Sequence, residues 1–571
     1  MTKAPAKIDQ AAKDDRLPQN FPAIHPPETL LLGRLMIRRA LSLLCLLLCL
    51  AGCQRETQVE KANRDKILIV GNSTDPKSLD PHLVTGVIES NIIRALLEGL
   101  VADDPKTDNA YPPGAATSWE HNPEFTEWTF HLRHDGQWSD GTPLTAHDFV
   151  FAYHRLLHPD LAGPYAEMLY FLKNAEAFNR GEITDFDQVG AKAIDDHTLH
   201  ISLKEPVPFL PDITRHYTWF PIPRHVVLRF SKNGNTISDR FTPWSDAGNL
   251  VGNGPFILKE WRFNDKIETA KNPRYWNAAN VKLNGVRFVP VENFYTETRG
   301  FLAGQLHATY QLPPPLVDKL KAEHPEFVRQ EPYIATDFIR INTTRPVLDQ
   351  PKVRMALSKA IDRKLLCDHI LQGNTPCGTI TPDMGDYQPD HIVSYDPQGA
   401  KDLLAEAGFP DGKGFPRFKI LMSSSGSRGT VEALQAMWKQ TLGVMIDVQP
   451  MDWGSYISSQ QKLDFDISLA AWTGDYLDPS TFLLMWTKDN GNNNTGWHSE
   501  EYENLLAEAA HQSNPAQRLA LFKQAERLFM EAQPVLPISF RGRNYLLRPE
   551  VKNWHPLLLD NHPWGALSLE P

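Results

Sequence analysis

Hydrophobic and polar positions change their period several times along the chain, and these changes predict both strands and helices. Residues 89–100 and 400–407 repeat apolar side chains at helical spacing, and a glycine lies at or near the end of each pattern. Thr145 and Asp148 have the spacing of a capping box, which predicts that a helix begins there. The short apolar or alternating runs that predict strands are 66–70, 128–133, 418–422 and 444–448.

One stretch, residues 464–479, combines a predicted strand with polar groups at its end. Residues 467–472 are apolar and mostly small, so they predict a buried strand that another backbone can approach closely. Gly474 breaks the strand, and Asp475 and Asp478 follow on the turn. An aromatic side chain and a carboxylate at a strand end could hold the amine of an extended peptide. Spacing alone favours the alternative, a core strand followed by a solvated turn.

The strongest apolar run, residues 40–51, predicts an export signal. It is too short to span a bilayer, which takes about 20 residues. Arg38 and Arg39 precede the run, and Gly52 and Cys53 follow it, as in a secretory signal peptide. The alternative is a buried helix.

The residues around Cys53 resemble the bacterial lipobox, Leu50-Ala51-Gly52-Cys53, in which the cysteine is acylated and becomes the mature N-terminus. We therefore expect 1–52 to be a leader with a lipoprotein signal peptide and 53–65 to be a polar tether. Translation is expected to start at Met36 rather than Met1. The mature protein is expected in the periplasm or cell envelope, anchored to a membrane by lipid.

Composition and charge limit the classes of partner that the protein is expected to bind. Charged residues make up 22% and hydrophobic residues 41% of the 571 residues, as in ordinary globular proteins. Removing residues 1–52, which hold 7 Lys and Arg and 4 Asp and Glu, changes the net charge from −11 to −14. An acidic protein repels phosphate backbones, so we expect no nucleic-acid partner.

Cysteines outside the leader predict a disulfide rather than a metal site. Cys367 and Cys377 are the two that remain after Cys53, and an oxidising compartment favours a bond between them. Two buried thiols are the alternative. Zinc takes four ligands, and His369 alone does not complete the set. We expect neither a metal nor a cofactor.

Catalytic motifs are missing from the sequence. It contains no Gly-x-Ser-x-Gly elbow, no His-Glu-x-x-His and no Walker loop. The 20 histidines are scattered. We therefore expect a protein that is not an enzyme.

Motifs along the whole mature chain resemble one family, the solute-binding proteins (family 5) of peptide-importing ABC transporters, and within it the oligopeptide-binding type. Each motif is weak alone, but together they follow the family order and spacing. They include Ser78-Leu-Asp-Pro-His82, Trp128-Thr-Phe-His-Leu-Arg133, Trp138-Ser-Asp-Gly-Thr-Pro143, Asn253-Gly-Pro-Phe256, Asn272-Pro-Arg-Tyr-Trp276 and Arg340-Ile-Asn-Thr343.

The resemblance implies an α/β fold of the class II periplasmic-binding type, with two lobes around a ligand cleft and a third, small lobe. Pro332 and Pro537 lie near the expected crossings between lobes, where proline would limit the conformations of a hinge. Ordinary proline-rich loops explain the same residues equally well. The ranges that the resemblance implies are 66–98, 222–334 and 541–571 for lobe I, 99–221 for lobe II and 335–540 for lobe III.

The resemblance also implies a function. The family captures peptides in its interlobe cleft and delivers them to the permease subunits of an ABC importer, and we expect a monomer that does so. The peptide is held between a lobe I segment and a strand edge, a form of β-augmentation. The ligand-binding residues implied here are Gly86, Val87, Tyr165, Tyr333, Trp453, Ala471, Trp472, Thr473 and Asp475, with Arg428 as a replacement for a missing basic residue.

The sequence departs from the family where the carboxyl end of the peptide is expected. Positions that are basic in the family read Leu371, Ser427 and Leu469, and a family glutamate is Arg340 here. This predicts a rebuilt half-site for a longer, blocked, branched or cell-wall (murein) peptide.

Two other functions stay open. One is a peptide-sensing or chaperone-like lipoprotein that presents its lobes to a receptor. The other is the same fold binding a nickel chelate, haem or an opine. Asp475 argues against the second, because its carboxylate suits an α-ammonium group.

Overall fold

The computed structural model describes residues 56–232, 236–424, 426–488, 490–512 and 514–570, and only the backbone at 453 and 454. The chain from Thr57 onward forms one compact unit. The predicted leader, the signal peptide and Cys53 lie outside the described residues. In the part that is described, no helix combines the length and the apolar character needed to cross a membrane.

The predicted tether is wrong from Gln58 onward, because helix α2 (Gln58–Asp65) occupies most of it. Thr57 caps the helix by accepting a hydrogen bond from the Glu60 N–H, and Glu60 completes a capping box. Val59 and Ala62 on one face are buried. The segment is polar in composition, but two apolar residues at helical spacing suffice to dock it.

The first sheet contains four strands in the order β1 (Ile67–Gly71), β8 (Gly285–Val289), β7 (Lys266–Lys271) and β6 (Phe256–Arg262). β1 and β8 are parallel, and the other neighbours are antiparallel. Parallel neighbours need a long crossover connection, and here residues 72–284 lie between β1 and β8 in the chain.

The second sheet is built within that crossover, from β2 (Ala116–His121), β3 (Glu127–Leu132), β5 (Thr198–Ser202) and β4 (Ala191–Asp195) in antiparallel order. Burial alternates along β3, as its sequence predicts. Helix α4 (Ala146–Leu157) begins at the predicted capping box, where the Thr145 N–H donates to Asp148 Oδ2 at 2.9 Å.

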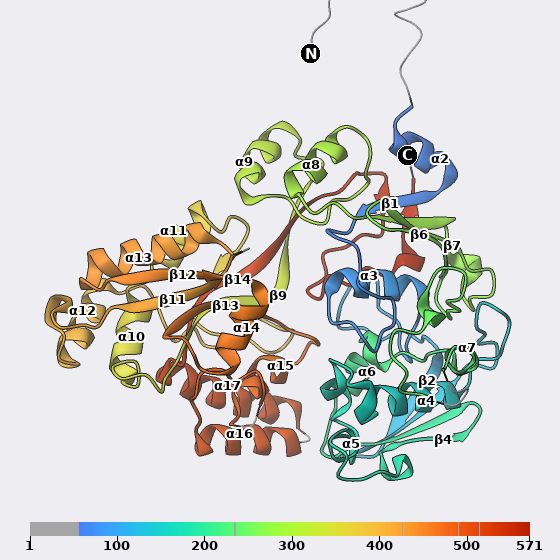
Figure 1. The fold of residues 1–571 in the computed structure, drawn as a ribbon, viewed down its shortest axis with the longest axis horizontal. Coiled ribbons are helices and arrows are strands. Elements are labelled where there is room, and N and C mark those ends of the chain that lie inside the picture. The colour runs from blue at the N-terminus through green and yellow to red at the C-terminus, as the bar shows by residue number, and fades with distance from the viewer. Residues whose placement is uncertain (1–55, 233–235, 425, 489, 513, 571) are drawn as a thin grey trace, which may run out of the picture. The chain divides into compact units, whose positions relative to one another are not determined.

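The third sheet has six strands in the order β10 (Thr375–Pro376), β14 (Val535–Leu546), β9 (Val328–Ile341), β13 (Ile467–Thr473), β11 (Phe418–Ser423) and β12 (Ile446–Met451). β9 and β14 pair antiparallel and run out of this sheet toward β1 (Figure 1). Pro332 and Pro537 lie inside these strands, each beside a shift of register, where proline is tolerated. The crossing is therefore a strand pair rather than two loops.

Helices cover the sheets and connect their strands. α12 (Pro397–Glu406) contains the apolar repeat predicted over 400–407, and it begins after Asp396, whose carboxylate accepts a hydrogen bond from the Gly399 N–H. The other helices are α3 (Val87–Leu96), α5 (Ala175–Asn179), α6 (Leu210–Ile213), α7 (Arg224–Arg229), α8 (Phe294–Leu302), α9 (Pro314–Glu323), α10 (Pro351–Lys359), α11 (Arg363–His369), α12 (Pro397–Glu406), α13 (Arg428–Leu442), α14 (Trp453–Gln461), α15 (Ser480–Leu483), α16 (Glu500–His511) and α17 (Pro515–Ala532). Two short strands, β15 (Val551–Lys552) and β16 (Ser568–Leu569), pair with each other.

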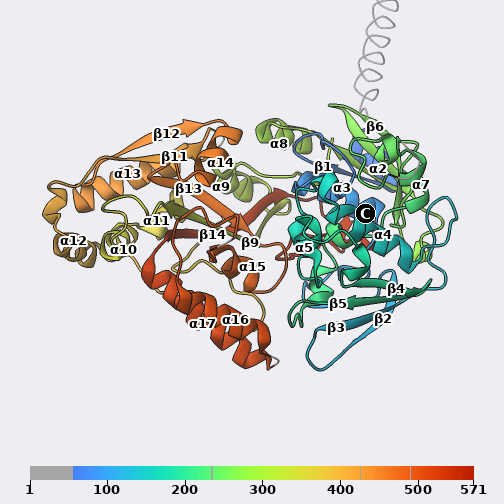
Figure 2. The same ribbon diagram turned by 60° about the horizontal axis from the view of Figure 1, so that its bottom comes forward.

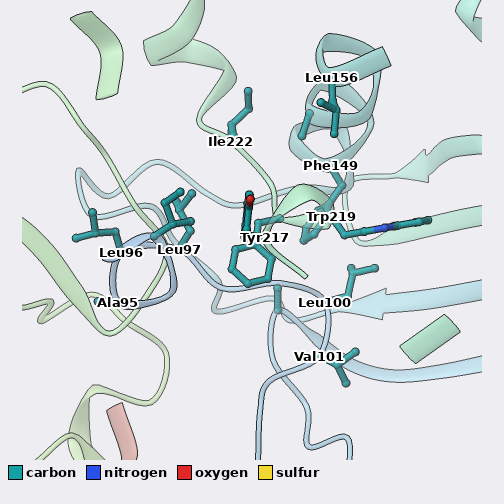
Figure 3. Packing of buried hydrophobic residues seen from close by; sticks show 14 of the residues in the cluster. Ala95, Leu96, Leu97, Leu100, Val101, Phe149, Leu156, Tyr217, Trp219 and Ile222 are labelled. Atoms are coloured by element: carbon teal, nitrogen blue, oxygen red, sulfur yellow. The ribbon is translucent and has the colours of Figure 1, made fainter. Parts of the chain in front are cut away.

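The buried side chains explain how these parts hold together. One apolar cluster is shared by the first two sheets, and Figure 3 shows that it contains Leu96 at the end of α3 together with Tyr217 and Trp219. The six-stranded sheet has a separate cluster on each face. Ile339 packs with residues of α10 and α13, whereas its neighbour Phe338 packs with residues of α16 and α17 (Figure 2), because successive strand residues point to opposite faces.

Candidate functional site

Strand β13 is the predicted buried strand, and its end is tightly packed. It pairs with β9 from Ile467 to Thr473 without a shift of register. Directly after it, a Cβ atom on Gly474 would lie 2.9 Å from Ile334 Cδ1 and 3.0 Å from Phe482 Cε2. Only glycine fits without displacing these side chains, so Gly474 sets the closeness of this contact.

The other edge of β13 is open along its second half. β11 pairs with β13 only at Ile467 and Ser468. In an antiparallel pair, successive residues direct their N–H and C=O groups to opposite edges. Because the Gly474 N–H donates to Ile334 O on the β9 side at 2.8 Å, Ala471 and Thr473 direct theirs to the open edge. This edge can accept an extended chain as a further strand.

A cavity of about 750 Å³ lies along this edge. Four of the predicted ligand-binding residues line it: Tyr333, Ala471, Trp472 and Thr473. The Trp472 indole is fixed, since its Nε1–H donates to Thr481 O at 2.8 Å. The cavity is also lined by residues that sequence reasoning missed, among them Gln311, Asp337, Asn374, Gln460, Asn492, Arg541 and Arg543.

Asp475 lies two residues beyond the end of β13 and is half-buried. Its backbone N–H donates to Thr481 Oγ1 at 3.0 Å. Among the described residues, no side chain or backbone group forms a hydrogen bond or ion pair with its carboxylate. Burial raises the pKa of this carboxyl to about 7, and the negative charge of Glu167 adds to the rise. Asp475 is not among the residues that line the cavity, but at the end of the same strand it presents a carboxylate that burial has separated from water and that has no cation beside it in the described part of the chain.

Asp478, three residues further on, braces the turn. It is buried, and Arg518 donates to its two carboxylate oxygens at 2.5 and 2.9 Å. The Ser480 N–H donates to Asp478 Oδ1 at 3.0 Å. Its charge is therefore already compensated, in contrast to that of Asp475.

The turn that carries Asp475 also contacts the part of the chain that holds the second sheet. Tyr476 stacks on Phe209 with 5.5 Å between ring centroids, and the Leu477 N–H donates to the Asp212 carboxylate. Arg518 lies over the same Phe209 ring at 4.9 Å. The sequence alone does not place Phe209 beside this turn, because nothing in local spacing reveals a contact across more than 200 residues.

Tyr165, Gly86 and Val87, which were also predicted to bind the ligand, are not among the residues that line the cavity. The Tyr165 ring lies edge-on to the His216 ring, with 5.7 Å between ring centroids. Burial and the charge of Asp475 raise the pKa of Tyr165. Gly86 precedes α3, and Val87 at its start is 42% exposed, but neither lines the cavity. Trp453 begins α14, and its side chain lies outside the described atoms.

Arg428 does not replace a missing basic residue of the cavity in this structure. It is the first residue of α13, where its side chain is exposed and pairs with Glu432 at 2.8 Å. Glu432 lies one helical turn later on the same face, so this local partner holds the guanidinium in solvent. Its neighbour Ser427 lines the cavity instead.

The predicted disulfide is not formed, because Cys367 and Cys377 are both free and buried. Cys367 lies in α11, whereas Cys377 follows β10. Burial raises the pKa of both thiols, so they stay protonated and are buried as neutral groups. Among the described residues there is no cluster of three or more metal-ligating side chains.

Comparison with known proteins places these features in a family. Residues 110–494 match the model for bacterial extracellular solute-binding proteins, family 5. The chain is 33% identical over 495 residues to the periplasmic oligopeptide-binding protein OppA of Salmonella typhimurium, covering 85% of this chain and 89% of that protein. It is 34% identical over 491 residues to the periplasmic murein peptide-binding protein MppA of Escherichia coli, covering 84% and 88%.

A solved structure supports the same assignment. The Haemophilus influenzae OppA complex with the peptide RPPGFSPFR matches with a TM-score of 0.75 and 32% identity, covering 89% of this chain and 99% of that one. The protein described here belongs to the bacterial extracellular solute-binding proteins of family 5.

Proposed function

We propose that this protein captures peptides at the open edge of β13 and delivers them to the permease subunits of an ABC importer. One observation carries the proposal: the Asp475 carboxylate is half-buried and uncompensated at the end of a strand with an open edge. The backbone groups of Ala471 and Thr473 can pair with any extended chain, whatever its side chains. Asp475 then neutralises the α-ammonium group at the end of that chain.

The proposal is tested by native mass spectrometry of the protein purified from its host. We expect a co-purified mixture of peptides with free amino termini. A homogeneous non-peptide ligand would contradict the proposal and favour the same fold serving another solute.

Binding is expected to depend on pH through Asp475. Because the carboxyl of the unliganded site has a pKa of about 7, acid removes the charge that the ammonium needs. Affinity should therefore rise with pH, by roughly thirtyfold between pH 5.5 and a pH well above 7, until the peptide amine itself loses its proton near pH 8. Calorimetry across this range measures how the peptide affinity changes with pH. A constant affinity between pH 5.5 and 7 would contradict the assignment.

We also propose that Cys53 carries a lipid anchor that keeps the protein at the envelope membrane. The apolar run before it and the motif Leu50-Ala51-Gly52-Cys53 support this. Wild-type protein is expected to begin at Cys53 and to carry the mass of two or three acyl chains, which give stable anchoring. Cys53→Ser should leave the precursor unlipidated. A wild-type protein that begins elsewhere without lipid mass would contradict the proposal.

A further inference from the structure

Among the described residues, the cavity beside β13 contains three cations that differ in their partners. Arg541 pairs with Asp337 at 2.6 Å, and Arg543 pairs with Asp560 at 2.8 Å. Arg340 also lines the cavity but has no carboxylate within ion-pair distance in the described part of the chain. The first two charges are compensated within the protein, and the third is not.

Arg340 is held in place while most of its donors remain unused. It lies in β9 opposite Ser468 of β13 and is only 4% exposed. Its Nη1–H donates to Gln460 Oε1 at 3.2 Å, and Gln460 in turn donates to Ser468 Oγ at 2.7 Å. The Nε–H is buried without a partner. A guanidinium has five N–H donors, so one uncharged acceptor leaves it far from satisfied.

Arg363 shows how neutral groups satisfy a buried guanidinium elsewhere in the chain. Arg363 is equally buried, but its guanidinium donates to the backbone oxygens of Pro537, Ser358 and Ile361 and to the Ser358 hydroxyl. Arg340 has instead two aromatic rings, Phe338 and Trp486, each 5.8 Å from its guanidinium carbon. Cation–π contacts offset part of the cost of burying the charge, but they do not satisfy its N–H donors.

Burial lowers the pKa of Arg340 to about 10, so the side chain is still protonated at neutral pH. A buried cation without a counter-charge is unfavourable, and the imbalance is removed when an anion binds. Uncharged polar side chains also line the cavity, including Gln460, Asn492 and Asn494. Leu371, Ser427 and Leu469 also line it and carry no charge.

We propose that Arg340, with Gln460 beside it, binds a carboxylate of the peptide ligand. This assignment deepens the proposed function and rests on it. The carboxylate is either the C-terminus or an acidic side chain, since both present the same two oxygens to a guanidinium. A ligand that is neutral throughout this region is excluded.

The spacing of the charges bears on ligand length. Ser468, opposite Arg340, and Asp475 are seven residues apart, which is roughly 23 Å along an extended strand. A peptide with its amine at Asp475 must therefore contain several residues before its C-terminus approaches Arg340, whereas an acidic side chain can reach it from an earlier position.

The test compares peptides that differ only in the carboxylate. Alanine peptides of three to seven residues are used as free acids and as C-terminal amides, together with amidated peptides that carry Glu or Gln at one internal position. Dissociation constants are measured by calorimetry for the wild type, Arg340→Gln and Arg541→Gln. For each protein, the dissociation constant of the amidated peptide is divided by that of the free acid. This ratio measures the contribution of the carboxylate alone, because other effects of each substitution cancel.

We expect the wild type to prefer one carboxylate form over its uncharged partner by about tenfold or more, and Arg340→Gln to lose this preference. Loss of the acid-over-amide preference identifies the C-terminus, and loss of the Glu-over-Gln preference identifies a side chain. The ligand-free unfolding midpoint of Arg340→Gln should not fall, since the substitution removes an uncompensated charge. A residue with only a structural role would lower the midpoint and leave the ratio unchanged.

Two results separate the failure of this assignment from that of the function. If the wild type binds peptides but does not discriminate carboxylates, or if only Arg541→Gln loses the preference, Arg340 is not the carboxylate-binding residue and peptide capture still stands. If the wild type binds none of the peptides, the proposed function fails and the assignment fails with it.

Discussion

Replacing Asp475 with Asn is expected to weaken the binding of a free-amine peptide by on the order of a hundredfold or more. The ammonium loses its water in the site, and removing one member of a buried charge pair typically costs roughly 3–5 kcal/mol, at about 1.4 kcal/mol per factor of ten in affinity. The carboxylate has no other partner among the described residues, so nothing nearby substitutes for it. Calorimetry with the same peptide on the wild type and on Asp475→Asn gives the ratio of the two dissociation constants.

The matched control for Asp475→Asn is Glu167→Gln, which neutralises the neighbouring carboxylate. Because the charge of Glu167 raises the pKa of Asp475, this variant should bind with similar affinity and show its pH dependence at lower pH. N-acetylation of the peptide should weaken binding to the wild type strongly and to the Asp475 variant little. An acetylated peptide that binds the wild type as tightly as the free amine would show that Asp475 is not the partner of the amine.

The second large effect is expected on stability, at Asp478. Asp478→Asn keeps an acceptor for the Ser480 N–H but leaves the buried Arg518 guanidinium without its counter-charge. Removing one partner of such a pair typically costs roughly 3–5 kcal/mol. Arg518→Met in the same background should recover part of the loss, because the uncompensated cation is then gone as well. Denaturant unfolding of the wild type, of Asp478→Asn and of the double variant measures the loss and the recovery of the free energy of unfolding.

An exposed pair of the same chemistry provides the control for Asp478. Arg417 donates to both oxygens of Asp447 at 2.6 and 2.8 Å, but these side chains are 64% and 44% exposed. Asp447→Asn should therefore cost less than about 1 kcal/mol. If Asp478→Asn is no more destabilising than this control, the buried pair does not hold the turn, and the separation of roles between the two aspartates is wrong.

The comparison between Asp475 and Asp478 shows how far local sequence reasoning extends. Both residues follow the same strand, and the sequence distinguishes them only by position and by resemblance to a family. The two carboxylates differ because Arg518, 40 residues after Asp478, forms an ion pair with Asp478 and not with Asp475. No periodicity or turn rule contains that information.

Short-range patterns determined several elements of this protein by themselves. Examples are the capping box at Thr145, the helix predicted over 400–407, the alternating strand β3 and the small-residue strand β13. All of them depend on backbone geometry and on neighbours close in sequence. Such preferences are written in consecutive residues. Family membership could also be read from the sequence, because many weak motifs occur in register along the chain.

The tertiary structure alone decided the remaining features. The open edge on β13 arises because β9 pairs along its whole length whereas β11 pairs with it only at Ile467 and Ser468. Only the fold shows that Arg428 has a local partner, while the buried Arg340 faces a cavity without a carboxylate partner among the described residues. The thiols of Cys367 and Cys377 are likewise free where sequence spacing favoured a bond. These outcomes depend on which groups from distant segments enter the same low-dielectric space, and that is fixed by packing rather than by local sequence.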